Sequence, residues 1–471
     1  MEIKQMILLA VAFLTAPVRS STQFHASWSH TGDAKVTSES LTVIWDGVKH
    51  HHRHRSHQLE ARFCEGEHDC HLVQGRLKHT GTSRGSLWMA TAKNLKPSTT
   101  YRIEVMEDSE KWSSDVFNVR TAPAPTSHDQ SFQFVFVGDL GLMDRADGLS
   151  NSTERVVSLI SSLDPLLVLL GGDLAYSDTD SRYSSVEQSI DMFFEQMKPF
   201  ASKSVLMPTY GNHEKYEGLK YWKRRFVLPH GVSEDTGSFY SFTVASVRFI
   251  SIAAPKCNKG LDQIGLEWVE AELKAAANDP DVKWAIPFFH VAPFANGHSH
   301  PSNMILRQQL LGIFTNYGVR IVLNAHDQNY ERTHPVLASS SEKDKFYRVE
   351  RSENINCYDS STKGTIFVKA SPGGKLSNQH KDFSHFRDKI PEAYTAFRED
   401  GHHHILNVKV SKDGNDLHIQ CLGIKDEHDD TPAIIDAFHY RLGNECNYQK
   451  NRAGSMLSNV RKNDDQLVLI K

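Results

Sequence analysis

The feature that most constrains the fold is a series of apolar stretches that each end in a polar group. FQFVFVGDLG begins at Phe132, LLVLLGGDLAY at Leu166 and VLMPTYGNHE at Val205. Between them lie STERVVSLISSL and VEQSIDMFFEQMKPF, whose spacing predicts amphipathic helices. Strands that are apolar throughout and alternate with helices are covered on both faces, so the pattern predicts an α/β domain. Ligands bind at the carboxyl ends of the strands in such sheets.

Five polar segments stand at these strand ends, because WAIPFF and VRIVLN lead into two more. Their side chains are carboxylates, a phenol, an amide and imidazoles: Asp139, Asp173, Tyr176, Asn212, His213, His290 and His326. One segment alone would fit an ordinary turn or a satisfied core histidine. Oxygen and imidazole donors without thiolates suit iron, zinc and manganese. Taken together, the five segments predict a two-metal site.

The chain before Phe132 has a different pattern. Residues 22–123 contain short alternating strands separated by turns, such as LTVIWDGV and YRIEVME, and these predict an all-β sandwich. Residues 124–131 are predicted to be a linker and residues 132–443 the catalytic domain. Residues 444–471 have the composition of a polar tail.

The first residues predict export from the cell. Residues 1–20 combine Lys4, the apolar run MILLAVAFL and small residues at Val18 and Ser20, which is typical of a secretory signal peptide. Export allows disulfides among the six cysteines. Cys64 and Cys70 would close a tight hairpin, and the other pairings stay open. Asn151, in Asn-Ser-Thr, is the predicted glycosylation site.

Charge and hydropathy exclude two classes of partner. The chain has 53 basic and 57 acidic residues and a net charge of −4, so bulk charge gives no reason to expect nucleic-acid binding. No other stretch reaches the length of a membrane span, and the sequence predicts no stable membrane anchor.

The five segments, in this order, resemble the signature of the metallophosphoesterase superfamily and specifically of the purple acid phosphatases (GDxG, GDxxY, GNH[DE], VxxH, GHxH). Tyr176 separates these from other members of the superfamily. The resemblance extends over NYERTHPV and GTIFVKASPGG and covers about residues 35 to 442. It implies a fibronectin type III-like sandwich followed by an α/β metallophosphoesterase domain with two mixed sheets flanked by helices.

The resemblance also implies a ligand set. Asp139 and Tyr176 would bind a first metal, normally ferric iron, and Asp173 would bridge both ions. The second ion would be iron, zinc or manganese. Its remaining ligands would be Asn212, His290 and His326.

The same resemblance implies a reaction. A metal-bound hydroxide would attack the phosphorus of a phosphate monoester. His213 would orient the substrate or protonate the leaving oxygen. His298 and His300 would contact the phosphate or, alternatively, belong to a mobile loop.

Three residues depart from the family pattern. Gln328 stands where the final histidine of GHxH would be, Ala325 replaces the glycine of that block, and Pro287 opens the fourth block. A glutamine carbonyl is a weaker donor to ferric iron than imidazole. The first site would then hold a different ion, bind iron loosely or be empty, unless a nearby histidine such as His298 or His334 supplies the missing nitrogen.

We therefore expect a secreted or lysosome-like acid phosphatase acting on small phosphate esters, with a homodimer as one possible assembly. The alternative is a degenerate homologue, weakened by Gln328, that binds or scaffolds without catalysis. A phosphodiesterase or nucleotide hydrolase would use the same metals, but Tyr176 and the β-sandwich argue against it.

Overall fold

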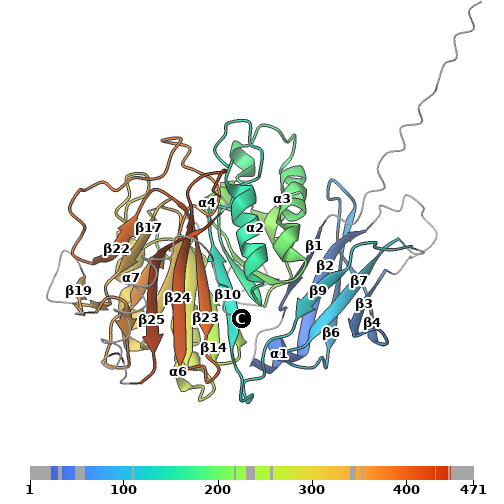
Figure 1. Ribbon diagram of the computed structural model, residues 1–471, viewed down its shortest axis with the longest axis horizontal. Helices are drawn as coiled ribbons and strands as arrows, with labels where there is room; N and C mark the ends of the chain where they lie inside the picture. The colour runs from blue at the N-terminus through green and yellow to red at the C-terminus, as the bar shows by residue number, and fades with distance from the viewer. Residues whose placement is uncertain are drawn as a thin grey trace, which may run out of the picture.

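The computed structural model describes residues 23–29, 34–47, 59–108, 111–216, 219–229, 239–254, 258–339, 346–352, 354–429, 431–443 and 446. The predicted signal peptide, residues 1–20, and nearly all of the predicted tail, residues 444–471, lie outside this set. Within it, two large sheets face each other and helices cover their outer faces, with a smaller β-sandwich at one end (Figure 1). The predicted fold class is confirmed.

The N-terminal region is a sandwich of two antiparallel sheets. One contains β1 (Phe24–Ser27), β2 (Ser40–Gly47), β6 (Ser86–Lys93) and β5 (Arg76–Thr80). The other contains β4 (Asp69–Gln74), β3 (Glu60–Glu65), β7 (Thr100–Asp108), β8 (Lys111–Trp112) and β9 (Phe117–Arg120). A short helix, α1 (Ala34–Glu39), precedes β2. The Trp45 indole nitrogen donates to the Met106 carbonyl at 2.8 Å and so ties the two sheets together.

The first large sheet carries three of the predicted polar segments. Its centre is formed by the parallel strands β10 (Phe132–Val137), β11 (Leu167–Gly171) and β12 (Val205–Thr209). On the far side of β10 the sheet continues with β23 (His403–Val410), β24 (Asp416–Ile424), β25 (Ala433–Arg441) and β20 (Cys357–Tyr358).

The second large sheet has seven strands and carries the other two segments. Its parallel centre is β14 (Val247–Ser251), β15 (Trp284–Val291), β16 (Ile321–Ala325) and β21 (Ile366–Lys369). Antiparallel strands β13 (Tyr240–Val244), β17 (Tyr330–Thr333) and β22 (Thr395–Glu399) complete it. A separate hairpin pairs β18 (Val336–Ala338) with β19 (Tyr347–Val349).

Three apolar cores follow from this layering. Phe134 and Phe136 of β10 pack between the sheets with Phe249 and Phe288 of the facing sheet. The other face of β10 to β12 is covered by α2 (Thr153–Leu163) and α3 (Val186–Ala201), and the second sheet is covered by α6 (Gln263–Asn278) and α7 (Met304–Asn316). Strands buried on both faces explain why their sequences show no polar alternation.

The β-sandwich is continuous with the first large sheet. β1 pairs with β12 in parallel, with Ala26 opposite Val205, so one sheet of eleven strands runs through both regions. The segment predicted as a linker also contacts the second region, because the backbone N–H of Gln130 donates to the Lys412 carbonyl at 2.8 Å. The N-terminal strands therefore lie directly against the α/β core (Figure 1).

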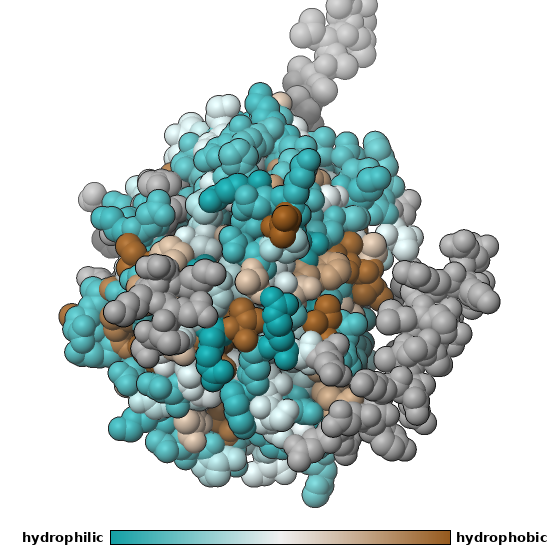
Figure 2. Space-filling view, turned by 90° about the vertical axis from the view of Figure 1, so that its left-hand side faces the viewer, coloured by the Kyte–Doolittle hydropathy of each residue, from teal (hydrophilic) through white to brown (hydrophobic). Residues whose placement is uncertain are grey.

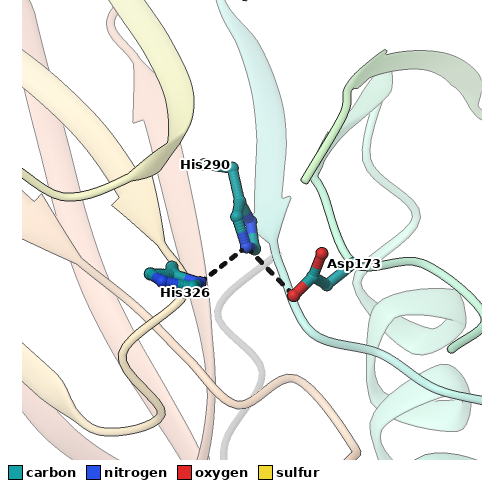
Figure 3. Close-up of side chains that lie close together, drawn as sticks. All are labelled: Asp173, His290 and His326. Atoms are coloured by element: carbon teal, nitrogen blue, oxygen red, sulfur yellow. Dashed lines mark hydrogen bonds and ion pairs between the residues drawn. The ribbon is translucent and has the colours of Figure 1, made fainter. Parts of the chain in front are cut away.

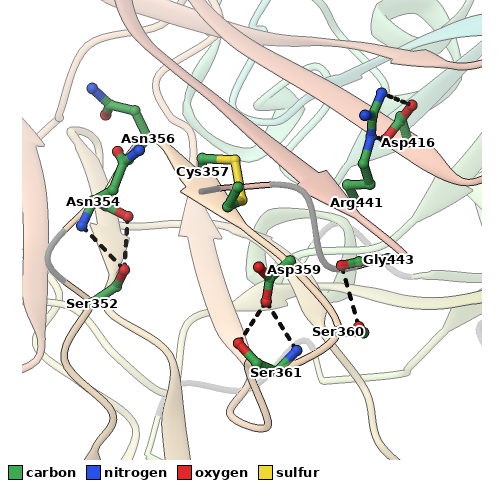
Figure 4. The surroundings of a disulfide bond; sticks show 11 residues. Ser352, Asn354, Asn356, Cys357, Asp359, Ser360, Ser361, Asp416, Arg441 and Gly443 are labelled. Carbon is green, nitrogen blue, oxygen red and sulfur yellow. Dashed lines mark hydrogen bonds and ion pairs between the residues drawn. A yellow bond between two sulfur atoms is a disulfide. The ribbon is translucent and has the colours of Figure 1, made fainter. Parts of the chain in front are cut away.

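Two disulfides lie among the described residues. Cys64–Cys70 closes the β3–β4 hairpin, as expected from the sequence. Cys357–Cys446 ties β20 to the chain beyond β25 (Figure 4). Cys421 is a buried free thiol, and Cys257 lies outside the described residues.

Among the described residues, none of the helices has the length and apolarity that a bilayer crossing requires. On the face shown in Figure 2, hydrophobic residues occur in small separate groups within a mainly hydrophilic surface.

Candidate metal centre

The predicted polar segments meet at one edge of the two sheets. Asp139, Asp173 and Asn212 follow β10, β11 and β12, while His290 lies near the end of β15 and His326 follows β16. Asp139, Asp173 and His326 have φ angles of 54°, 53° and 75°, and Tyr176 has 55°. Non-glycine residues in this left-handed region carry strain that is concentrated at functional sites.

Glycines allow the two sheets to approach this closely. A Cβ on Gly211 would lie 2.1 Å from an Asp173 carboxylate oxygen, so no larger residue fits beside that side chain. A Cβ on Gly138 would lie 2.4 Å from the Cβ of Ala325. Ala325, which replaces a glycine of the family pattern, is therefore accommodated by the glycine opposite it.

Asp173, His290 and His326 converge on one point (Figure 3). The His290 Nε2 lies 3.1 Å from Asp173 Oδ2 and 3.1 Å from His326 Nδ1. His290 Nδ1 lies 2.8 Å from the Gly171 carbonyl, which fixes the ring with Nδ1 as the donor. Burial keeps the pKa of His326 well below its ordinary value, which favours the neutral imidazole that a metal ion requires.

Asn212 offers an oxygen donor between Gly211 and His213, two residues that lie against Asp173. Its side chain is buried, and within the described part of the chain its Oδ1 has no hydrogen-bond partner. A buried carbonyl oxygen without a partner is costly. A cation beside Asp173 would satisfy it.

Asp139, Tyr176 and Gln328 form the other half of the site. The Tyr176 hydroxyl donates to Asp139 Oδ1 at 2.6 Å. The Gln328 amide nitrogen donates to the Tyr176 oxygen at 2.9 Å and to Asp139 Oδ1 at 3.3 Å. Burial, followed by the Asp139 charge, raises the pKa of Tyr176 well above its ordinary value.

His213 lies beside both halves of the site. Its backbone N–H donates to Asp173 Oδ1 at 2.9 Å, and its ring packs 4.1 Å from the Tyr176 ring. His213 Nδ1 lies 2.7 Å from Asp178 Oδ1. Burial lowers the pKa of His213, but Asp173 and the Asp178 hydrogen bond outweigh it and raise the pKa overall.

Two residues that support the site were not predicted from the sequence. Asp178 holds the His213 ring, and Glu214 accepts from the backbone N–H groups of Asp173, Leu174 and Gly211 at 2.7–2.8 Å. Glu214 thereby fixes the turns that present Asp173 and Asn212. The signals that could have found them are the position of Asp178, two residues after Tyr176, and that of Glu214, the acidic residue of the GNH[DE] block.

The remaining predicted residues lie at different distances from the centre. His300 stacks on His326 with ring centroids 4.0 Å apart, so it belongs to the site. His298 stacks instead on His380 at 5.2 Å. His334 donates its backbone N–H to the Tyr394 carbonyl, and among the described residues neither His298 nor His334 bonds to Asp139 or Tyr176. The Asn151 side chain is exposed before α2.

Comparison with known proteins agrees with this arrangement. Residues 132–330 match the calcineurin-like phosphoesterase family. Purple acid phosphatase 22 of Arabidopsis thaliana is 26% identical over 281 residues, which cover 58% of this chain and 56% of the relative. Residues 132–330 therefore form a calcineurin-like phosphoesterase domain, and the chain is similar to purple acid phosphatases.

Solved structures show the same fold. A purple acid phosphatase from yellow lupin (Lupinus luteus) seeds superposes with a TM-score of 0.69 at 18% identity, covering 89% of this chain and 74% of that one. The structure of PhoD superposes with a TM-score of 0.61 at 10% identity, covering 90% and 92%. The metallophosphoesterase chain spans little more than half the length of the first curated relatives that it matches.

The metallophosphoesterase fold implies divalent metal ions at a dinuclear site. The half formed by Asp173, Asn212, His290 and His326 fits an ion, because its donors converge and the Asn212 oxygen lacks a partner. The half around Asp139 fits a metal ion less well, since the two Asp139 carboxylate oxygens already accept hydrogen bonds from four donors.

Proposed function

We propose that the chain is a metal-dependent hydrolase of phosphate monoesters. The observation that carries this proposal is the convergence of Asp173, His290 and His326 beside the unpartnered Asn212 oxygen, with the His213–Asp178 pair next to it. The phosphatase names of the relatives support the same reaction class.

The residues divide the work as follows. Asp173, Asn212, His290 and His326 would hold a divalent ion, which when bound acts as a Lewis acid on phosphoryl oxygens. His213, oriented by Asp178, would donate a proton to the leaving oxygen. His300, stacked on His326, would contact the phosphate. His298, which stacks on His380, would be a second phosphate contact.

The cellular setting belongs to the same proposal. We expect removal of residues 1–20, glycosylation of Asn151 and residence outside the cell or in an acidic vesicle. The exposed Asn151 side chain is accessible to a glycan. We further expect the N-terminal sandwich to be related to fibronectin type III domains, as suggested by its two facing antiparallel sheets.

The test is hydrolysis of p-nitrophenyl phosphate by the full chain, supplied with Mn²⁺, Zn²⁺ or iron, with bis-p-nitrophenyl phosphate as the diester comparison. Asp173→Asn is expected to lose bound metal and at least ~100-fold in kcat, because its carboxylate lies against His290 and receives the His213 N–H. Asp281→Asn, at an exposed turn, is the control.

A second candidate function is supported by Gln328. Its amide stands where the family pattern has an imidazole and donates hydrogen bonds instead of offering a lone pair. A chain that binds metal but hydrolyses neither the monoester nor the diester would favour a degenerate homologue that acts by binding.

A further inference from the structure

The Asp139 carboxylate is saturated by donors of the protein itself. Oδ1 accepts from the Tyr176 hydroxyl and the Gln328 amide, and Oδ2 accepts from the Ser371 hydroxyl at 2.7 Å and the His326 backbone N–H at 3.1 Å. A carboxylate has about four lone-pair sites, and all are in use.

The orientation of the Gln328 amide follows from this network. Because the Tyr176 hydroxyl gives its proton to Asp139, its oxygen must accept, and only the NH₂ side of the amide can donate to it. The reverse orientation would place the amide oxygen against the Asp139 carboxylate. The Gln328 amide therefore donates an N–H to Asp139 Oδ1 and stabilises the negative charge of the carboxylate, as a metal ion would.

The Lys375 side chain brings an ammonium group against Tyr176 in the same half. Its ammonium lies 4.3 Å from the centroid of the Tyr176 ring and is held by the Leu376 carbonyl at 2.9 Å and Asn378 Oδ1 at 2.7 Å. The Lys375 backbone N–H donates to the Asp139 carbonyl at 3.0 Å. Gly141, with a φ of 69°, permits this approach, since a Cβ there would lie 2.7 Å from the Lys375 Cβ.

The charges present suit one divalent ion better than two. Asp139 and Asp173 face the site, while the carboxylate oxygens of Glu214 accept hydrogen bonds from backbone N–H groups. One divalent ion alone balances these two carboxylates, and the buried Lys375 ammonium adds a further positive charge. A second ion beside Asp139 would add to the positive charge of the ammonium and would have to displace the four hydrogen bonds, and among the described residues no imidazole nitrogen bonds to the Asp139 carboxylate.

We propose that this chain binds a single divalent ion, held by Asp173, Asn212, His290 and His326, and that Gln328 and Lys375 take the place of a second ion beside Asp139. This inference rests on the proposed metal site but not on the proposed reaction. Metal content and catalysis can therefore fail separately.

The test is titration of the metal-free full chain with Mn²⁺, followed by calorimetry, elemental analysis and electron paramagnetic resonance. We expect one ion per chain and the signal of an isolated Mn²⁺. Two ions per chain, or the exchange-coupled signal of a carboxylate-bridged pair, would overturn the proposal, as would failure to bind any ion.

Substitution of Gln328 and Lys375 should allow a second ion to bind beside Asp139. Gln328→His combined with Lys375→Met restores an imidazole and removes the ammonium, so a second ion should bind at least ~10-fold more tightly than to the native chain, with a coupled signal. Gln328→His alone should gain less. Lys409→Met, on an exposed position of β23, is the matched control and should keep one ion.

Two outcomes separate this proposal from the proposed function. A native chain with one ion and no phosphatase activity would support the single-ion site and remove the proposed reaction. A native chain with two ions and high activity would support the proposed reaction and overturn the single-ion site. A double variant that folds and stays at one ion would show that Lys375 and Gln328 do not exclude the second, and would overturn their assignment.

Discussion

The Asp178 carboxylate lies 2.7 Å from His213 Nδ1 and fixes the ring, whose Nε2 lies 3.9 Å from Asp173 Oδ2 at the site. Asp178→Asn keeps the volume but loses the charge that favours a protonated His213. We expect kcat to fall ~10–100-fold while bound metal stays at the native level. The loss should be larger for an alkyl phosphate than for p-nitrophenyl phosphate, because a poor leaving group depends more on a proton donor.

Exposed Asp281→Asn serves as the control for that experiment. Equal losses on both substrates would argue that Asp178 has only a structural role. Loss of metal in Asp178→Asn would place the defect in the ion's ligands and contradict the assignment of His213 as a proton donor.

Residue by residue, the sequence predicts what lies at strand ends and misses what folding brings in from elsewhere. Asp139, Asp173 and His326 follow apolar runs, so their meeting at one edge could be expected. Ser371 and Lys375 reach Asp139 from more than 230 residues along the chain, and although GTIFVKASPGG contains Ser371 and ends just before Lys375, its pattern does not indicate that either contacts Asp139. Gln328 could be recognised as a departure, but its role as a donor depends on where the Tyr176 proton lies.

At the scale of elements, Glu399 joins two strands through histidines. At the end of β22 it lies 2.7 Å from His404 Nε2 of β23 and 2.9 Å from His402 Nδ1. Burial would raise the pKa of Glu399, but these histidines outweigh it and lower the pKa from 4.5 to about 2. A lowered carboxyl pKa contributes stability that is present above pH 4.5 and is lost as the pH falls towards 2.

We therefore expect Glu399→Gln to cost about 1–2 kcal/mol at neutral pH, after allowance for solvent screening. The difference from the native chain should shrink between pH 4.5 and 2. Denaturant unfolding at several pH values measures it. The exposed Glu67→Gln is the control. A difference that stays constant down to pH 2 would contradict the role given to the Glu399 charge.

The strands themselves were predictable to different degrees. β10, β11 and β12 are almost entirely apolar, and such a pattern predicts strands that are buried on both faces of a sheet. The pairing of β1 with β12 was not predictable, because β1 is four residues long and a Pro-containing segment at 124–131 suggested two independent domains. Pairing between strands far apart in sequence depends on tertiary contacts that alternation does not encode.

Across the whole molecule, Arg225 links the N-terminal strands to the phosphoesterase core. Its side chain is fully buried, donates to Gln23 Oε1 at 2.5 Å, and forms ion pairs with Asp191 and Glu187 of α3. Together with the β1–β12 pairing, this contact joins the β-sandwich to the first large sheet. The two regions should therefore unfold together.

Arg225→Met tests this junction. It leaves the buried Asp191 carboxylate without its cation, and removing one partner of a buried pair costs about 3–5 kcal/mol. We expect a large fall in Tm, with calorimetry and far-ultraviolet circular dichroism still reporting one shared transition. Arg224→Met is the matched control, because Arg224 is 39% exposed and lies 3.9 Å from Glu187, so its loss should cost no more than about 1 kcal/mol. Two resolved transitions in the native chain, or equal effects of the two substitutions, would mean that the sandwich and the core are stabilised independently and that Arg225 does not join them.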